Sequence, residues 1–109
     1  MRILVDSEKK ESGEWAKERL EEFGRGMHIT VAQNADSRQL GGNWSYIIVL
    51  GECPGELPAG KPVARYPIPK NEAEEAELKR SLWALYRDEL RDMIGSKCSC
   101  GLYDVCHCH

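Results

Sequence analysis

The run Tyr46-Ile47-Ile48-Val49-Leu50 constrains the fold of this chain more than any other segment. Its residues are aliphatic apart from one tyrosine, and none of them is polar enough to mark a face in contact with water. A strand of this kind is typical of a parallel sheet that is covered on both faces. We therefore expect a central strand over residues 46–50, with other elements packed above and below it.

Three further segments favour strands. They are Arg2-Ile3-Leu4-Val5, residues 27–32 (Met27 to Ala32), and the short run 63–66, which is followed by Pro67. Residues 33–43 contain Gly41-Gly42 and are predicted to be a loop or a short covering segment, and residues 51–62 form a Gly/Pro-rich loop.

Two segments have the apolar spacing of a helix. Over residues 14–23, Ala16, Leu20 and Phe23 recur at i, i+4 and i+7, and Gly24 follows as a stop signal. Over residues 71–94, Asn71 and the glutamate three positions later form a capping box, and Gly95 ends the helix. The apolar stripe of this second helix consists of Leu78, Leu82, Leu85, Tyr86, Leu90, Met93 and Ile94. The order of elements predicts an α/β domain over residues 1–95 with a four-stranded, mostly parallel sheet.

A dense cluster of metal-ligand side chains follows this domain, in residues 96–109. Cys98, Cys100, Cys106 and Cys108 form two Cys-x-Cys pairs separated by five residues, and His107 and His109 accompany the second pair. Zinc takes four N or S ligands in a tetrahedron, and thiolate-rich sets also suit copper(I) and iron–sulfur clusters. We predict a C-terminal zinc-binding knot.

The assignment within this cluster stays open. Our preferred ligands are the four cysteines, and either histidine is an alternative to one thiolate. A site filled by four protein ligands leaves no position for a substrate, which favours a structural clip near the end of the last helix. The alternative interpretation is a tail of free thiols, which would be prone to oxidation.

Three places in the chain carry a resemblance to a known family. Residues 2–5 lie where that family has the strand before its phosphate loop. Residues 46–50 with Gly51-Glu52-Cys53-Pro54 match its central strand and the loop that follows. Its Trp-Pro-Leu-Asp-Asp-Pro segment and its last helix match Arg65-Tyr66-Pro67-Ile68-Pro69 and residues 71–94. Residues 2–95 thus resemble the low-molecular-weight protein tyrosine phosphatases, most of all their thioredoxin-linked arsenate reductase branch. The resemblance implies a small three-layer domain with strand order 2-1-3-4.

The catalytic residues of that family are missing here. Its nucleophilic cysteine falls at Asp6, its phosphate-binding arginine at Ser12 and the serine after it at Gly13, so that Asp6 and Ser12 are degenerate phosphate-loop positions. The general-acid segment reads Pro69-Lys70-Asn71, without a carboxylate. The resemblance therefore implies the fold, and we expect no catalytic residue at these positions.

Four other features of the sequence have a structural and a functional interpretation. Asp6 is predicted to cap the first helix, with cation binding as the alternative. Cys53 is either a buried apolar filler or a lone reactive thiol. Residues 55–61 fit the first seven positions of a nucleotide P-loop, but Pro62 replaces its Ser/Thr and a strand follows, so we interpret the match as coincidence. Trp44, in the Gly-rich loop, is a candidate for a partner surface.

Net charge and hydropathy indicate which partners and which cellular location to expect. With 15 basic and 18 acidic residues, the net charge of −3 disfavours nucleic acid and anionic lipid as partners. The N-terminal apolar run is too short for a signal peptide, and no stretch approaches the ~18 apolar residues of a membrane helix. We expect a cytoplasmic protein, where thiols stay reduced and clustered cysteines tend to bind metal.

These observations leave three hypotheses for function. The first is a non-catalytic, phosphatase-like α/β module that acts through protein–protein contacts and carries a zinc-binding C-terminus. The second is a metal carrier or sensor, and the third is a thiol redox protein that uses Cys53 and the tail cysteines.

Overall fold

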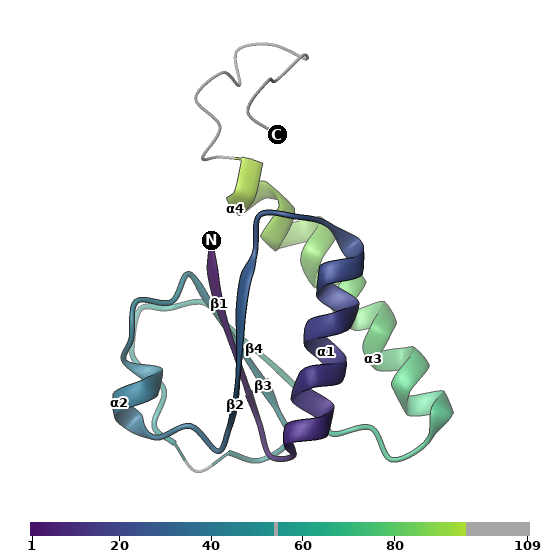
Figure 1. Cartoon of the computed structure of the whole chain (residues 1–109), viewed down its shortest axis with the longest axis horizontal. Coiled ribbons are helices and arrows are strands. Elements are labelled where there is room, and N and C mark those ends of the chain that lie inside the picture. Colours follow the sequence, from purple (N-terminus) through teal and green to yellow (C-terminus); the bar gives the residue numbers. More distant parts are fainter. Residues whose placement is uncertain (54, 96–109) are drawn as a thin grey trace.

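A four-stranded parallel sheet forms the centre of the molecule. The computed structural model describes residues 1–53 and 55–95, and Figure 1 shows how their elements are arranged. The strands are β1 (Arg2–Ser7), β2 (His28–Gln33), β3 (Tyr46–Leu50) and β4 (Val63–Tyr66). They are hydrogen-bonded in the order β2-β1-β3-β4, and all three pairings are parallel. The expected α/β class, parallel sheet and strand order are confirmed, whereas the predicted metal-binding knot lies outside the described residues.

The two central strands are the most buried elements. Every residue of β3 is buried, and so is every residue of β1 after Arg2. Register pairs such as Leu4 with Ile47 and Val5 with Ile48 place apolar side chains next to one another on both faces of the sheet. The apolar run at 46–50 therefore has the central position that its composition predicts.

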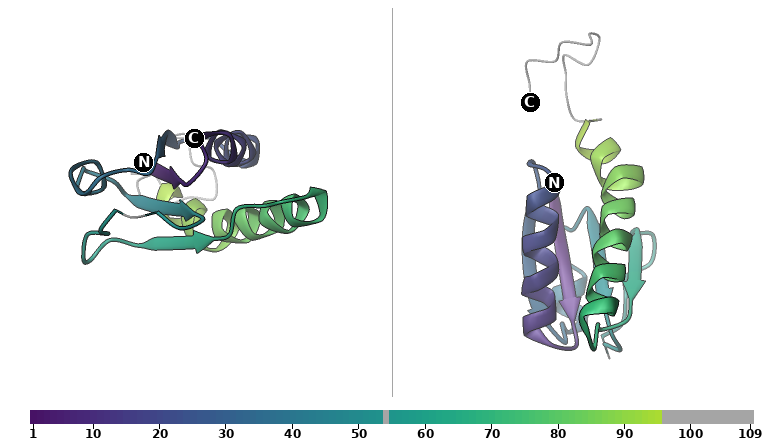
Figure 2. Two further views of the ribbon diagram at one scale, coloured as in Figure 1. Left: turned by 90° about the horizontal axis from the view of Figure 1, so that it is seen from below. Right: turned by 90° about the vertical axis from the view of Figure 1, so that its right-hand side faces the viewer.

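One face of the sheet carries both long helices. These are α1 (Lys10–Phe23) and α3 (Glu72–Leu85), and α3 continues through a π-helical turn, η1 (Tyr86–Leu90), into α4 (Arg91–Gly95). Figure 2 shows the two helices side by side on this face. The core between them and the sheet contains Ile3, Val5, Ala16, Leu20, Ile29, Tyr46, Ile48, Leu50, Leu78, Leu82, Leu85, Tyr86 and Leu90.

The opposite face has a thinner cover. It consists of the single-turn helix α2 (Ser37–Leu40) and parts of the loops before β3 and β4. Here Leu40 and Ala35 pack on Leu4, Ile47 and Val49 of the sheet. The chain thus has the expected three layers, with helices concentrated on one side.

The first helix begins at Lys10, four residues earlier than the apolar spacing predicts. The Ser7 hydroxyl accepts a hydrogen bond from the Lys9 backbone N–H (3.2 Å) and donates one to the Lys9 carbonyl, which starts the turn directly after β1. Gly13 is buried in the second turn of α1. Because glycine contributes no apolar side chain, the sequence pattern does not reveal that this turn faces the sheet.

The last helix is interrupted where the sequence predicts one continuous helix. Its cap is as expected, because the Asn71 side chain accepts from the Glu74 N–H at 2.9 Å and the Glu74 carboxylate accepts from the Lys70 N–H at 3.0 Å. The interruption, η1, follows from the spacing of the buried residues. Leu78, Leu82, Tyr86 and Leu90 are four residues apart, so each step turns about 40° beyond a full turn of a regular α-helix.

A π-turn holds more residues per turn and therefore offsets this drift, so that Tyr86 and Leu90 stay buried. The Tyr46 hydroxyl donates to the Glu89 carboxylate at 3.2 Å and joins η1 to the first residue of β3. None of the helices within the described ranges has the length and apolarity needed to cross a membrane.

Gly13 generates a prediction about stability. A Cβ atom at this position would lie 2.7 Å from Val31 Cγ1 and 3.1 Å from Ser7 Cβ, both on the sheet. Alanine favours a helix over glycine by roughly 1 kcal/mol, whereas overpacking a core costs about 1–3 kcal/mol. We expect Gly13→Ala to lower the free energy of unfolding by about 1–2 kcal/mol, as measured by urea denaturation. The neighbouring variant Ser12→Ala is the control and should cost little; a Gly13→Ala variant more stable than the parent would contradict the packing.

Candidate functional site

The carboxyl ends of β1 and β3 form the switch point of the sheet. From β1 the chain crosses to β2 on one side, and it later returns to β3 on the other side of β1. The loops that follow these two adjacent strands therefore diverge, and such a crevice is where open α/β sheets bind ligands. The residues here are Asp6, Ser7 and Glu8 after β1, and Gly51, Glu52 and Cys53 after β3.

Asp6 is the most buried polar residue at this edge apart from Ser7, with 1% of its surface exposed. Its Oδ1 accepts a hydrogen bond from the Ala35 backbone N–H at 2.8 Å. Its Oδ2 is buried and has no hydrogen-bond partner among the residues that the structure describes. Asp6 thus fixes the loop between β2 and α2 to the end of β1.

The predicted role of Asp6 as a helix cap is wrong. The N-cap of α1 is Lys9, without a side-chain cap. The side chain of Asp6 bonds instead to Ala35, a residue of the core on the sheet face opposite to α1. In a strand successive side chains alternate between faces, so Ser7 and not Asp6 points toward the helix.

The two degenerate phosphate-loop positions lie in different elements. Asp6 is within β1 and Ser12 is within the first turn of α1, so that only Glu8 and Lys9 separate the strand from the helix. A phosphate cradle needs a loop whose backbone N–H groups converge on the anion. The connection here is a tight turn closed by Ser7.

A second set of contacts joins the two loops at the switch point. The Glu8 N–H donates to the Leu50 carbonyl at 2.9 Å, and the Glu8 carboxylate accepts from the Glu52 N–H at 3.2 Å. Gly51 lies between them with φ +80°, and a Cβ there would approach Glu8 Oε2 to 2.5 Å. Glycine is therefore required at 51 by both conformation and space. A shallow hollow of about 480 Å³ adjoins this turn, and its lining includes Glu8, Glu52, Arg65 and Lys70.

Cys53 is half-buried against this turn. Its thiol is 3.6 Å from the Asp6 carbonyl oxygen and 3.7 Å from the Leu50 carbonyl oxygen, to which it can donate. Burial raises the pKa of Cys53 to about 11, and the negative charges of Asp6 and Glu8 add to the effect, whereas Arg65 opposes it. At neutral pH Cys53 is therefore a thiol, which is a poor nucleophile and a poor metal ligand.

The predicted metal ligands are not placed by the structure. Cys98, Cys100, Cys106, Cys108, His107 and His109 lie outside the described residues. Within the described ranges, no group of three or more His, Cys, Asp or Glu side chains is arranged to hold a metal ion. Figure 1 shows that α4 ends near the N-terminus, at the end of the sheet where the strands begin, whereas Cys53 follows the carboxyl end of β3.

Two other sequence features have structural roles. Trp44, expected at a partner surface, is half-buried; its indole N–H donates to the Gln39 carbonyl at 2.7 Å, and the Arg2 guanidinium lies 4.7 Å from its ring centroid. Lys61, at the lysine position of the P-loop match, donates to the Gly42 carbonyl, and β4 follows instead of a helix. The P-loop match is therefore coincidental, as predicted.

The sequence pattern does not predict that Arg65 and Lys70 line the hollow beside Gly51, or that Trp83 is exposed. Trp83 is 42% exposed, stacks on Tyr86 with ring centroids 5.8 Å apart, and meets Phe23 edge-on at 5.1 Å. The helical spacing of Trp83 and Tyr86 indicates that their rings pack together, but it does not indicate that the Trp83 ring is also exposed to water.

Comparison of the chain with protein families, with curated proteins and with solved structures gives no match. The phosphatase resemblance accordingly stays a prediction.

The environment of Cys53 generates a prediction about reactivity. We expect iodoacetamide to modify Cys53 slowly at pH 7–8 in the native protein, with a rate that rises about tenfold per pH unit toward the pKa of about 11. Asp6→Asn keeps an oxygen for the Ala35 N–H but removes the charge, so the pKa should fall and the rate at pH 8 should rise. Peptide mass spectrometry measures Cys53 separately from the tail cysteines, and guanidinium-unfolded protein is the control. A native rate with a midpoint below pH 8 would overturn this assignment.

Proposed function

We propose that this chain is a non-catalytic α/β module that acts through contacts with a protein partner and binds one zinc ion through its C-terminal Cys/His segment. Two separate arguments support the proposal. One concerns the chemistry of the strand edge, and the other concerns the ligand types after residue 95.

The proposal that the module is non-catalytic rests on the environments of Cys53 and Asp6. Cys53, the nucleophilic side-chain type at the switch point, is held as a thiol by a pKa of about 11. Asp6 is buried and bonded to the Ala35 N–H, so its carboxylate is inaccessible to a substrate. Catalytic sites need groups whose pKa suits the working pH and which a substrate can reach.

The ligand set of the tail supports zinc. Four cysteines and two histidines fall within the last twelve residues, and their S and N atoms match the ligands of structural zinc sites. Zinc is preferred over copper(I) and an iron–sulfur cluster because histidines accompany the thiolates.

A metal carrier or sensor is the second candidate, because six ligand-type side chains exceed the four positions of a tetrahedral ion. A structural clip and a metal carrier differ in how the loss of metal affects the α/β domain. A clip loses stability when the metal is removed, whereas a carrier releases metal without unfolding the α/β domain. The raised pKa of Cys53 weighs against the redox hypothesis.

The metal proposal generates a direct test. We expect untagged full-length protein, made in medium that contains iron, zinc and copper, to hold one zinc per chain by elemental analysis. Cys98→Ser and Cys106→Ser should each reduce the zinc content strongly, because each removes a thiolate from a different Cys-x-Cys pair. Acidification should release the metal as the thiolates become protonated.

Cys53→Ser is the matched control and should keep its zinc, since Cys53 lies in the α/β domain, after the carboxyl end of β3, and is not one of the predicted ligands. Thermal unfolding with and without a chelator then separates a clip from a carrier. Protein without bound metal, whose tail thiols react equally with and without added zinc, would end the metal proposal.

A further inference from the structure

The two edges of the sheet differ in how they are protected. β4 has four residues, contains the exposed Arg65 and is flanked by Pro62 and Pro67. Charge, proline and short length all hinder pairing with another chain. β2 has six residues without Lys, Arg, Asp, Glu or Pro, and it follows β1 in unbroken register from His28 to Gln33. An edge strand without these protections is a template for another strand.

The backbone of β2 has unpaired groups along this edge. His28 N–H donates to the Met1 carbonyl at 2.7 Å, and Asn34 N–H donates to the Ser7 carbonyl at 3.0 Å. Backbone groups alternate along a strand, so Ile29, Val31 and Gln33 direct theirs away from β1. In the part of the chain that the structure describes, no backbone group pairs with them on that side. Figure 1 looks onto this edge, and no described element lies in front of β2.

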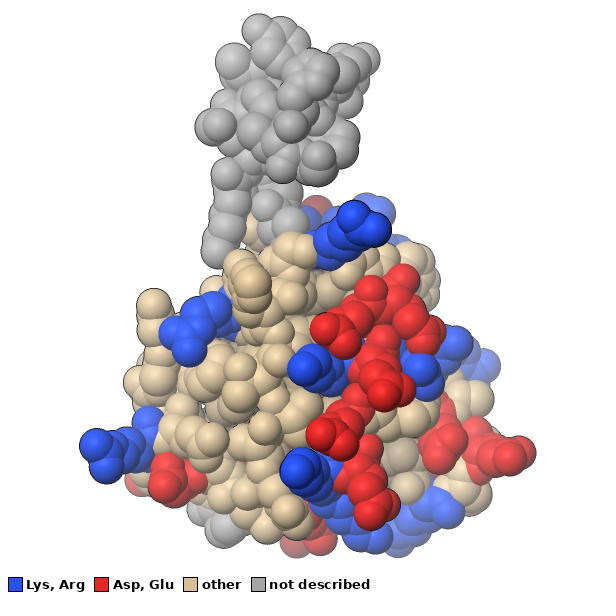
Figure 3. Space-filling model, viewed as in Figure 1, with Lys and Arg blue, Asp and Glu red and all other residues tan. Residues whose placement is uncertain are grey.

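A stripe of alternating charge borders the edge. Gly13 packs against Val31, so this side of α1 lies over β2. The residues that follow around the helix on the same side are Lys10, Glu14, Lys17 and Glu21, which we call the Lys/Glu stripe. In Figure 3, blue and red side chains alternate along α1 beside an uncharged area.

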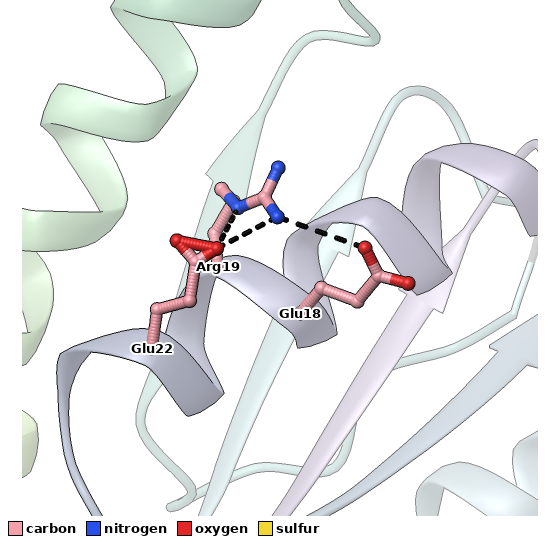
Figure 4. A network of polar contacts seen from close by, with 3 residues as sticks. All are labelled: Glu18, Arg19 and Glu22. Atoms are coloured by element: carbon pink, nitrogen blue, oxygen red, sulfur yellow. Dashed lines mark hydrogen bonds and ion pairs between the residues drawn. The ribbon is translucent and has the colours of Figure 1, made fainter.

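The charges of the Lys/Glu stripe are available to a partner. Arg19, on another side of α1, pairs with Glu22 at 2.7 Å and lies 3.6 Å from Glu18, as Figure 4 shows. By contrast, no residue of the stripe has an ion pair or hydrogen bond within the described ranges.

We propose that two copies of this chain pair antiparallel through β2, about a two-fold axis at Thr30. This axis sets Thr30 opposite Thr30 of the second copy, and the outward-facing Ile29 opposite its Val31. Residues directly opposite in such a ladder keep to the same face of the sheet, and each of these outward-facing pairs exchanges two backbone hydrogen bonds. The two sheets become one continuous sheet, without like charges in opposite strands.

The same axis makes the Lys/Glu stripe complementary to itself. With the helices antiparallel, Lys10 faces Glu21 of the second copy, and Glu14 faces its Lys17. The centre of this pairing lies between Trp15 and Ala16, about 4 Å along α1 from Gly13, which packs on Val31. Because α1 runs antiparallel to β2, this step corresponds to about one strand residue and places the centre at Thr30. Gly13 packs between Ser7 of β1 and Val31 of β2, so α1 lies over the groove between these strands. With neighbouring strands about 4.8 Å apart, the two copies of α1 therefore come to roughly 10 Å, within reach of these long side chains. An extended peptide would satisfy the backbone of β2 but would leave the stripe unmatched, which favours a second copy.

A charge swap on α1 tests the proposal. The full chain, in the presence of a chelator, is followed by sedimentation from micromolar to millimolar concentration and should show a monomer–dimer equilibrium. Lys17→Glu sets glutamates opposite each other twice per dimer, and Glu14→Lys does the same with lysines, so each should weaken the dimer about tenfold or more. The double variant Glu14→Lys/Lys17→Glu restores opposite charges and should recover the parent affinity.

A backbone substitution provides an independent test. The N–H of Gln33 points away from β1, so Gln33→Pro removes a donor needed only by the second copy and should weaken the dimer, whereas Gln33→Ala should not. If Gln33→Pro does not fold, the charge swap on the surface of α1 decides the question. A parent protein that stays monomeric throughout, or a dimer that neither charge reversal weakens, overturns the proposal. A dimer that disappears with chelator also overturns it, because the tails would then join the copies.

Discussion

The structure depends on the complete burial of two adjacent strands, β1 and β3. Because their side chains alternate between faces, both faces of the sheet must be covered. The long helices α1 and α3 cover one face. The other face is left to α2 and the loops before β3 and β4. These loops have to be held in place by a few specific bonds, and Asp6, which bonds to Ala35, and Lys61, which bonds to Gly42, supply two of them.

This constraint also determines the chemistry of the strand edge. A carboxylate and a thiol follow the ends of the adjacent strands β1 and β3, and burial gives both an environment unlike that of a reactive pair. The carboxylate of Asp6 is bonded to the Ala35 N–H, and its negative charge adds to the effect of burial in raising the pKa of Cys53. An active thiol needs the opposite environment, with positive charge nearby and access for a substrate. Arg65 is the described cation that lowers the pKa of Cys53, and its effect is smaller than those of burial and of Asp6.

The sequence predicts the sheet well because each strand has a local signal, and it predicts the capped start of α3 because Asn71 and Glu74 form a local motif. The strand order came from the family resemblance. The errors concern features that the apolar pattern does not reveal, and two of them involve contacts between residues distant in the chain. The early start of α1 depends on Gly13 fitting against Val31, the role of Asp6 depends on Ala35, and η1 depends on a buried spacing that suits this sheet. The metal ligands lie outside the described residues and stay a prediction.

The uneven cover of the sheet bears on how copies of the chain would assemble. Since α1 lies over β2, the Lys/Glu stripe borders the free backbone of the edge, and one two-fold axis satisfies both. Antiparallel pairing sets the carboxyl edge of one sheet on the same side as the start of the strands in the other. The last helix, α4, ends at the start of the strands, so the two copies of α4 end on opposite sides of the dimer (Figure 1). Edge pairing uses β2 and α1, whereas the predicted metal ligands follow α4 in the sequence, so the two properties depend on different residues and can be tested separately.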